Sequence, residues 1–424
     1  MILVLLGFLL IGLPVGIAFS LFILIQPERW NVSLDYAAQT TLDALLVYPF
    51  LAIPLFMLAG ELMTQGGLTR QLVGVSKRMM AHVPASMGHI MIGASAMMGA
   101  VTGSSVAAVA AIGRALGPEM LQRGYKPGYV GALNASAGLL GVLLPPSIPL
   151  ILYGSAVGAS ITQLFLATLL PGLIFVVAIM AVHALRARHV LENGIEHEAP
   201  SATASRTFAA EFLSALPALF MPVMVLGGIY TGIFTPTEAA GVAAVYALLY
   251  IVVSRSVGSR QLGDAFVRAA ISAAAVMFII GFTTIFNRAL TLEQIPQDLA
   301  TFAIDLTQNP LLFLLLVNLA LLVVGMFMET SAAILLMGPL LAPAATQYGI
   351  DPIHFGIIVV INIEIGLLTP PLAANLYVAS LTNRIPIMAL LRQIGWFLLA
   401  CLVMLAAITY VPGIALWYRI LPGY

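Results

Sequence analysis

Two short polar clusters interrupt apolar stretches of this sequence, and they carry residue types that could bind a small cation. The first is Thr102–Ser105 (TGSS) and the second is Met328–Ser331 (METS). Their hydroxyl groups are hard oxygen ligands of the kind that a sodium ion prefers. Each cluster lies midway along an apolar region, at 87–121 and at 310–347. We therefore interpret each region as a hairpin of two half-length helices rather than as one span.

Two double prolines mark further breaks inside apolar runs. One lies in Gly141–Ser147 and the other in Gly366–Pro371. A double proline cannot continue a helix, and an unpaired carbonyl in lipid costs several kcal/mol, so such a break must line a cavity or bind an ion. We predict that free carbonyls at the helix ends before Gly141 and Gly366 join the cluster hydroxyls in two sodium sites.

The same breaks create helix N-termini that could bind an anion. Half-helices starting at Ser104, Ser147, Thr330 and Pro371 present uncapped N–H groups, which favour an anion by roughly 0.3–1 kcal/mol each. No Lys or Arg lies near the predicted midplane, so these dipoles and the bound cations would balance the charge of a carboxylate substrate. The residues predicted to contact this substrate are Ser104, Ser147, Asn134, Glu329, Thr330 and Asn375. The alternative is that the hydroxyl groups only cap helices and the asparagines only bridge them.

The composition places these clusters in a membrane protein. Of 424 residues, 61% are apolar and only 8% are charged, which leaves a water-soluble surface too few polar groups. The formal net charge is zero, so nothing suggests a nucleic-acid partner. The single cysteine, Cys401, excludes an intrachain disulfide, and the six histidines show no metal-ligand spacing. We expect no organic cofactor, no metal other than sodium and no catalytic residue.

Apolar runs predict an all-α polytopic fold. Predicted spans lie near 2–26, 44–63, 128–158, 162–185, 212–231, 237–254, 265–288, 353–382 and 393–416. We expect the run at 2–26 to be a spanning helix rather than a cleaved signal. A polar segment at 186–210 reads as an exposed linker. With a cytoplasmic N-terminus and a periplasmic C-terminus, 14 Lys/Arg fall on the cytoplasmic side and three outside, at Arg29, Arg288 and Arg419.

An offset of 225 residues aligns glycines and prolines of the two halves, which indicates an internal repeat. The matched pairs include Gly113 with Gly338, Pro118 with Pro343, Gly141 with Gly366, and Pro145-Pro146 with Pro370-Pro371. The loop after the first hairpin is basic and its counterpart is not, so the charge rule places them on opposite sides. This predicts an inverted repeat, the recurring plan of secondary transporters.

Two further acids need individual interpretation. Glu364, two residues before Gly366, could tune the second ion site, carry a proton or pair across a helix interface. Glu238 follows Thr235-Pro236-Thr237 and is typical of a helix first-turn acid, so we expect a structural role.

The motifs that carry these clusters resemble one family. They are Gly99–Ala107 (GAVTGSSVA), Leu139–Pro149 (LLGVLLPPSIP), Phe234–Ala240 (FTPTEAA) and Gly366–Pro371 (GLLTPP). Over essentially the whole chain, the sequence is similar to the large membrane subunit of tripartite ATP-independent periplasmic (TRAP) transporters. The resemblance implies sodium-driven uptake of an organic acid in the inner membrane of bacteria or archaea. It also implies a periplasmic substrate-binding protein, a small four-helix membrane subunit expected as a separate chain, and an elevator mechanism.

The pattern and the resemblance together define the predicted sites and parts. The predicted sodium-binding residues, for two or more ions, are Thr102, Gly103, Ser104, Ser105, Gly141, Leu144, Pro146, Thr330, Ser331, Gly366, Thr369 and Pro371. The predicted mobile transport part comprises 87–158 and 310–382. The predicted scaffold comprises 1–86, 159–185, 211–309 and 383–424, with a cytoplasmic linker at 186–210.

Three alternatives were weighed. A stand-alone carboxylate carrier of the wider ion-transporter superfamily would share the hairpins but need no soluble receptor. A membrane enzyme is disfavoured because the sequence has no HExxH, no GxSG with a partner histidine and no paired catalytic aspartates. A purely structural subunit would not explain four breaks related by pseudosymmetry. The pattern leaves open whether the acid is a C4-dicarboxylate, a sialic or sugar acid, or a keto acid.

Overall fold

Helices make up all the regular secondary structure in the described part of the chain. The computed structural model describes residues 7–8, 13, 15–25, 28, 30, 32–80, 82–191 and 208–420. The elements are α2 (Val15–Leu24), α3 (Leu34–Leu45), η1 (Tyr48–Leu51), α4 (Ala52–Gln65), α5 (Leu68–Met80), α6 (Ser86–Thr102), α7 (Ser105–Gln122), α8 (Pro127–Gly138), α9 (Leu140–Leu143), α10 (Ile148–Val157), α11 (Ile161–Val190), α12 (Phe208–Tyr230), α13 (Pro236–Ser254), α14 (Ser259–Leu292), α15 (Ile295–Leu306), α16 (Pro310–Phe327), α17 (Thr330–Gln347), α18 (Pro352–Gly366), α19 (Ala374–Asn383), α20 (Ile387–Tyr410), α21 (Pro412–Ala415) and η3 (Trp417–Ile420).

Several of these helices are long and apolar enough to cross a membrane. In the described residues five single helices qualify, and up to seven spans result if each of two bent pairs counts as one. The bends are 60° between α3 and the segment Tyr48–Gln65, and 46° between Pro127–Leu143 and α10. Within the predicted span 2–26 the structure describes α2. Most of the predicted linker, residues 192–207, lies outside the described residues.

Both polar clusters break a helix at the predicted positions. In the first hairpin, α6 ends at Thr102, Gly103 is left-handed with φ +61°, and Ser104 caps α7. In the second hairpin, α16 ends at Phe327 and Glu329 caps α17. The two hairpin tips, Thr102–Ser105 and Met328–Ser331, are called tip 1 and tip 2 below.

The double prolines also interrupt helices, but the boundaries differ from those predicted. Helical structure passes through Gly141 as far as Leu143, and extended backbone begins at Leu144. The reason is that Pro145 removes a donor without preventing the preceding residues from donating their own N–H groups. In the second half, the helix that was expected to start at Pro371 starts at Ala374 instead. The Leu372 N–H donates to Met326 O of α16 (3.0 Å), which holds this stretch outside a helix.

Three helices, α3, α5 and α15, were not predicted. Long apolar runs reveal spans, whereas these shorter helices mix apolar and polar residues.

An ion-pair cluster joins α5 to α7. Lys77 of α5 contacts Glu119 of α7 (2.5 Å), and Glu119 also binds Arg123 (2.9 Å). Burial would raise the pKa of Glu119, but its bonds to Lys77 and Arg123 outweigh burial and hold that pKa below its usual value.

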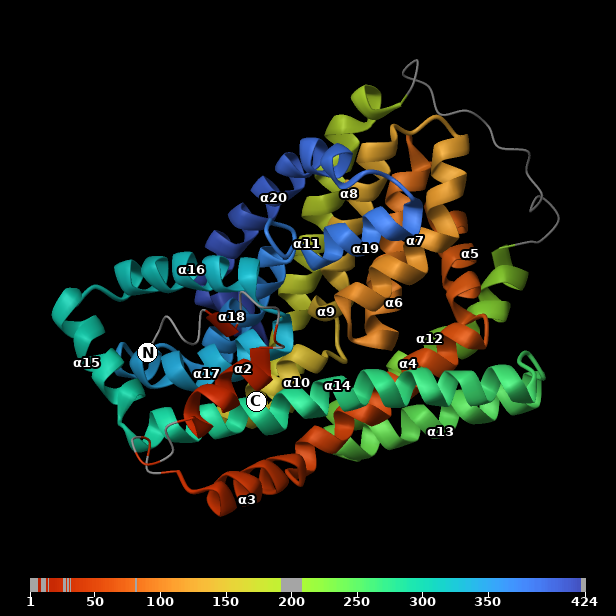
Figure 1. Ribbon diagram of the computed structural model, residues 1–424. Coiled ribbons are helices and arrows are strands. Elements are labelled where there is room, and N and C mark those ends of the chain that lie inside the picture. Colours follow the sequence, from red (N-terminus) through yellow and green to blue (C-terminus); the bar gives the residue numbers. More distant parts are fainter. Residues whose placement is uncertain are drawn as a thin grey trace.

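Two sets of neighbouring helices can be distinguished within one continuous core (Figure 1). In one group α14, 34 residues long, runs along one side of the molecule and packs against α2, α3 and α4, while α13 packs against α4 and α12. In the other group α20 packs against α8, α11 and α18. The packing of α11 and α20 therefore associates them with the broken helices, although the sequence assigned 159–185 and 383–424 to the scaffold.

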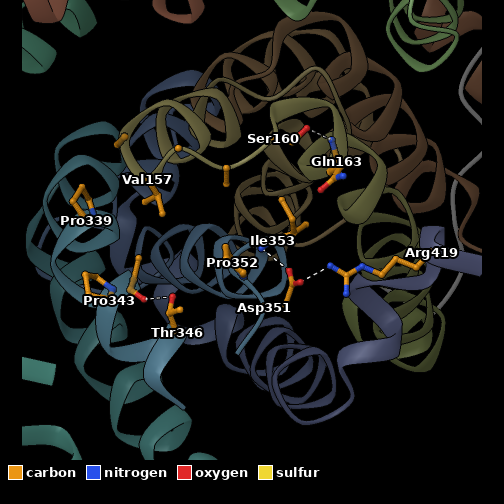
Figure 2. A pocket seen from close by; sticks show the side chains of 14 residues that line it. Val157, Ser160, Gln163, Pro339, Pro343, Thr346, Asp351, Pro352, Ile353 and Arg419 are labelled. Atoms are coloured by element: carbon orange, nitrogen blue, oxygen red, sulfur yellow. Dashed lines mark hydrogen bonds and ion pairs between the residues drawn. The ribbon is translucent and has the colours of Figure 1, made fainter. Parts of the chain in front are cut away.

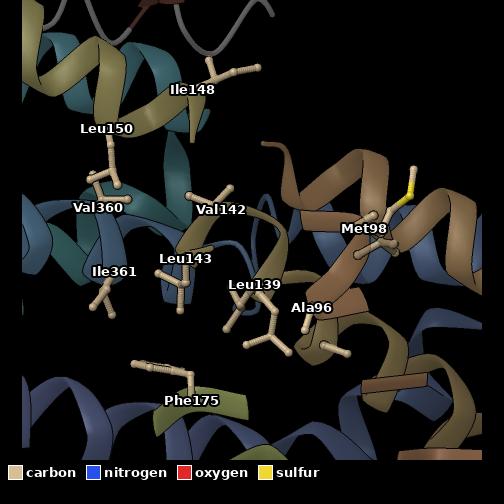
Figure 3. Close-up of a cluster of buried hydrophobic side chains, with 14 of the residues drawn as sticks. Ala96, Met98, Leu139, Val142, Leu143, Ile148, Leu150, Phe175, Val360 and Ile361 are labelled. Atoms are coloured by element: carbon tan, nitrogen blue, oxygen red, sulfur yellow. The ribbon is translucent and has the colours of Figure 1, made fainter. Parts of the chain in front are cut away.

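Close packing surrounds the first broken helix (Figure 3). Leu139 and Leu143 lie near Phe175 of α11 and Ile361 of α18, and all four side chains are buried. Thr168 of α11 donates its hydroxyl to Leu143 O (2.9 Å), so one carbonyl at the break is satisfied by a side chain. Close packing and such hydrogen bonds hold helices together in lipid, where no hydrophobic driving force acts between them.

Candidate functional site

A cavity of about 600 Å³ lies between the two hairpin tips and the helices α4 and α14. All four residues of tip 1 line it. Tip 2 contributes Glu329, Thr330 and Ser331, and α18 contributes Glu364. Segments more than 200 residues apart in the sequence therefore line one cavity, and α4 and α14 complete its lining.

Tip 1 lies directly against the first break. The Gly103 carbonyl accepts a hydrogen bond from the Ile148 N–H, the first N–H of α10 (3.3 Å). A Cβ added at Gly103 would lie 2.7 Å from Pro146 O, and one added at Gly141 would lie 2.7 Å from Ser104 O. The structure thus brings four of the predicted sodium-binding residues together.

The oxygen atoms around this contact suit a cation. Four residues after Gly141 and Val142 come Pro145 and Pro146, which have no N–H to donate to these helical carbonyls. Leu144, also predicted as a ligand, begins the extended segment. The nearby hydroxyls make local bonds: Thr102 donates to Met98 O (3.1 Å). A hydroxyl that donates such a local hydrogen bond can either cap a helix or bind an ion through its oxygen.

The second break has its own cluster of oxygens. The Gly366 carbonyl accepts from the Thr369 N–H (2.9 Å) and from the Thr369 hydroxyl (2.7 Å). Gly366 lies so close to Gly325 of α16 that an added Cβ would meet Gly325 backbone carbon at 2.5 Å. Pro371 is exposed rather than enclosed with these oxygens. Of the second set, Gly366 and Thr369 are therefore held together close to tip 2 of the hairpin.

The two acids beside tip 2 have different surroundings. Glu329 accepts hydrogen bonds from the Ser331 N–H (2.8 Å), the Ala332 N–H (3.3 Å) and the Ser331 hydroxyl (3.0 Å), so it caps α17. Glu364 is 2% exposed and accepts from the Thr330 hydroxyl at 2.9 Å. Glu364 thereby fixes tip 2 to α18.

Three predicted substrate residues do not reach this cavity. Ser147, Asn134 and Asn375 are fully buried and do not line it. The Asn134 amide donates to Val109 O (3.0 Å) and so joins α8 to α7, the bridging role considered as an alternative. Ser104, Glu329 and Thr330 are the predicted substrate residues that line the cavity.

Two further acids, Glu238 and Glu61, have clear partners in the structure. Glu238 forms a capping box with Thr235 at the start of α13, as its position predicted. An ion pair that the sequence reasoning missed joins Glu61 of α4 to Arg268 of α14, with Nε 2.6 Å from Oε1, and Glu61 lines the cavity. The only signal for it was an isolated acid at the end of an apolar run.

A second cavity of about 510 Å³ lies beside the ion pair of Asp351 and Arg419 (Figure 2). Its lining comes from the α10–α11 loop, from α17 and from the start of α18. No predicted site residue lines it. The cavity between the tips is therefore the candidate functional site.

Comparisons with known proteins agree on one family. The family model described as "Tripartite ATP-independent periplasmic transporter, DctM component" matches residues 2–414. A C4-dicarboxylate TRAP transporter large permease protein from Pseudomonas aeruginosa is 39% identical over 370 residues, covering 87% of this chain and 86% of the relative. A sialic acid TRAP transporter large permease protein from Vibrio cholerae is 34% identical, covering 97% and 96%.

Two further matches add to this. An isethionate TRAP transporter permease protein from Oleidesulfovibrio alaskensis is 37% identical over 97% of this chain, but the match spans only 64% of that longer relative. The crystal structure of the Alcanivorax borkumensis YdaH transporter shares the fold, with a TM-score of 0.66 at 15% identity, covering 92% of this chain and 90% of that one. The relatives matched by sequence are permease subunits rather than enzymes, as the sequence predicted.

Proposed function

Because this chain belongs to the DctM family of tripartite ATP-independent periplasmic transporters, we propose that it carries a small organic acid across the membrane. The observation that carries this proposal is the single cavity lined by both hairpin tips. The named relatives transport C4-dicarboxylates, sialic acid or isethionate. A small organic anion is the class that these cargoes share.

We propose sodium as the coupling ion. Support comes from the oxygens at the two breaks: the Pro146 and Ser104 carbonyls lie close to Gly103 and Gly141 at the first, and the Gly366 carbonyl meets the Thr369 hydroxyl at the second. At the first site Gly103, Ser104, Gly141 and Pro146 would hold the ion, and at the second site Gly366 and Thr369 would. When bound, sodium would supply positive charge beside the cavity.

The helix N-termini at the cavity support an anionic cargo. Tip 1 precedes α7 and tip 2 precedes α17, so two N-terminal dipole ends meet at one cavity. The tip 2 dipole is partly neutralised by Glu329, which accepts N–H groups of α17. Ser104 and Thr330, at these two N-termini, would contact the cargo. The coupling ions would balance the negative charge of the cargo and of the glutamates that line the cavity.

The transport movement that we propose is of the elevator type. The hairpins and broken helices, together with α11 and α20, would move as one body against a scaffold of α2 to α4 and α12 to α14. The repeated order of hairpin and broken helix in the two halves supports an inverted repeat. Including α11 and α20 in the moving body revises the grouping expected from sequence, because both pack against α8.

The family supports the remaining assignments that we propose. They are an inner-membrane location with a cytoplasmic N-terminus and a periplasmic C-terminus, a small four-helix membrane subunit as a partner, and a periplasmic substrate-binding protein that delivers the acid. Exposed apolar side chains on α13, α14 and α16, such as Val253, Ile271 and Val323, suit contact with lipid or with a membrane subunit.

Uptake in proteoliposomes tests this function. The chain would be reconstituted with its small subunit and binding protein, and uptake of labelled succinate, N-acetylneuraminate and 2-keto acids measured with and without an inward sodium gradient. Ser104→Ala and Thr369→Ala should weaken the apparent sodium affinity by about tenfold, as expected for a lost polar contact of about 1.4 kcal/mol.

Thr301→Ala is the matched control, because this exposed hydroxyl of α15 donates to Gln297 O of its own helix (3.0 Å) and lies outside the cavity lining. It should leave uptake unchanged. Sodium-independent uptake in the wild type would contradict the coupling. Robust uptake without the binding protein would instead favour a stand-alone carrier.

A further inference from the structure

The cavity between the tips has an unbalanced set of charges. Its lining includes three acids, Glu61, Glu329 and Glu364, and no lysine or arginine among the residues that the structure describes. An organic anion entering it would meet carboxylates from tip 2, from α18 and from α4. A basic group within reach of the cavity would therefore have a large effect on which anions can bind.

Arg268 of α14 is positioned to be that group. Its Nε donates to Glu61 Oε1 at 2.6 Å, and the next residue, Ala269, lines the cavity together with Ser272 one turn further along. On α4, Glu61 lies on the same helix face as Gly60 and Thr64, which also line the cavity. The ion pair thus lies beside the parts of α4 and α14 that line the cavity.

The geometry of the pair leaves Arg268 able to bind a second acceptor. A guanidinium has five N–H donors in a planar fork, and among the described residues the side-chain hydrogen bond of Arg268 uses Nε alone. Its side chain is 46% exposed, whereas that of Glu61 is 25% exposed. The Nη donors can therefore meet a carboxylate or sulfonate, groups that the fork binds in two-point fashion.

We propose that Arg268 is an anion-binding residue at the mouth of the cavity and that Glu61 competes with the substrate for it. Without an anion, Glu61 holds the guanidinium against α4. When the substrate arrives, its carboxylate takes the Nη donors. This inference rests on the proposed transport of an organic acid. It adds to the site a residue of α14, outside the hairpins.

Two single substitutions with opposite expected effects test the proposal. Succinate binding to the purified transporter complex would be measured by titration calorimetry. Arg268→Gln should weaken binding by about tenfold, and Glu61→Gln should tighten it by about tenfold, because it frees the guanidinium from its competitor. A partly exposed ion pair contributes little to folding stability, so both variants should fold.

The controls separate this role from a structural one. Arg260→Gln removes the same charge from an exposed position in the first turn of α14 and should leave binding within about twofold, since Arg260 lies about 12 Å along the helix from Arg268 and is not next to a cavity-lining residue. The double exchange Glu61→Arg with Arg268→Glu keeps a pair but moves the cation to α4, and it should not restore wild-type affinity.

Equal losses in both single variants, restored by the exchange, would show that the pair only joins α4 to α14 and would overturn the proposal. An unchanged affinity in Arg268→Gln would overturn it as well. If the wild-type complex neither binds nor transports succinate, N-acetylneuraminate, isethionate or a keto acid, both the proposed function and this inference fail.

Discussion

Replacing Gly103 by alanine should separate tip 1 from the first break and so weaken sodium binding. Gly103 has φ +61°, and a Cβ there would lie 2.7 Å from Pro146 O, a backbone atom that cannot rotate away. The left-handed conformation costs a non-glycine residue about 1–2 kcal/mol. Overpacking against a fixed neighbour adds about 1–3 kcal/mol.

Gly158→Ala provides a control that isolates the second contribution. Gly158, between α10 and α11, has φ +77°, and a Cβ there would meet nothing within 4 Å. Both substitutions therefore introduce the same kind of backbone strain, but only Gly103→Ala pushes against the break. The difference of about 1–3 kcal/mol corresponds to a weakening of sodium binding by about 5- to 150-fold.

The assay is thermal unfolding of the purified protein at increasing sodium chloride, with potassium chloride at equal ionic strength as reference. A ligand at a hundred times its Kd stabilises by about 2.7 kcal/mol, so a bound ion gives a measurable rise in Tm. For Gly103→Ala the rise should need higher sodium than in the wild type. For Gly158→Ala the titration should match the wild type.

The reasoning would be refuted if the two alanine variants gave the same sodium titration. In that case the approach of Gly103 to Pro146 would carry no ion-binding role, and the effect of Gly103→Ala would reduce to backbone strain.

Two further predictions concern the packing of the breaks. Thr168→Val should lower the free energy of unfolding, measured by chemical denaturation, by about 1–3 kcal/mol, because the buried Leu143 carbonyl loses its donor. An unchanged free energy of unfolding would mean that another group donates to this carbonyl. Gly366→Ala should abolish sodium-dependent uptake, since its Cβ would lie 2.5 Å from the Gly325 backbone, whereas Gly241→Ala, with nothing within 4 Å, should transport normally. Uptake by Gly366→Ala at the wild-type rate would show that α16 and α18 can separate without loss of function.

Local chemistry explains why the sequence predicted the helix breaks. Glycine and proline act on the backbone within a few residues, so the interruptions at Gly103 and at Pro145-Pro146 could be predicted without knowledge of the fold. The capping role of Glu238 follows from the same short-range logic.

Boundaries and burial depended on longer-range contacts. The start of α19 at Ala374 reflects a hydrogen bond from Leu372 to Met326 of another helix, which no local pattern announces. Asn134 and Asn375 have the residue type of a binding site, yet packing encloses both away from the cavity. A polar side chain in an apolar run is equally compatible with a site and with a helix bridge until its neighbours are known.

The sequence by itself determined that this is a polytopic membrane protein with two hairpins and two broken helices, because composition and backbone chemistry act residue by residue. Only the tertiary structure decided that both tips face one cavity, that α11 and α20 pack with the broken helices, and that Arg268 approaches Glu61. The physical reason is that such contacts join residues far apart in the sequence, as with Glu61 and Arg268, which are 207 positions apart, and are set by helix packing rather than by local preference.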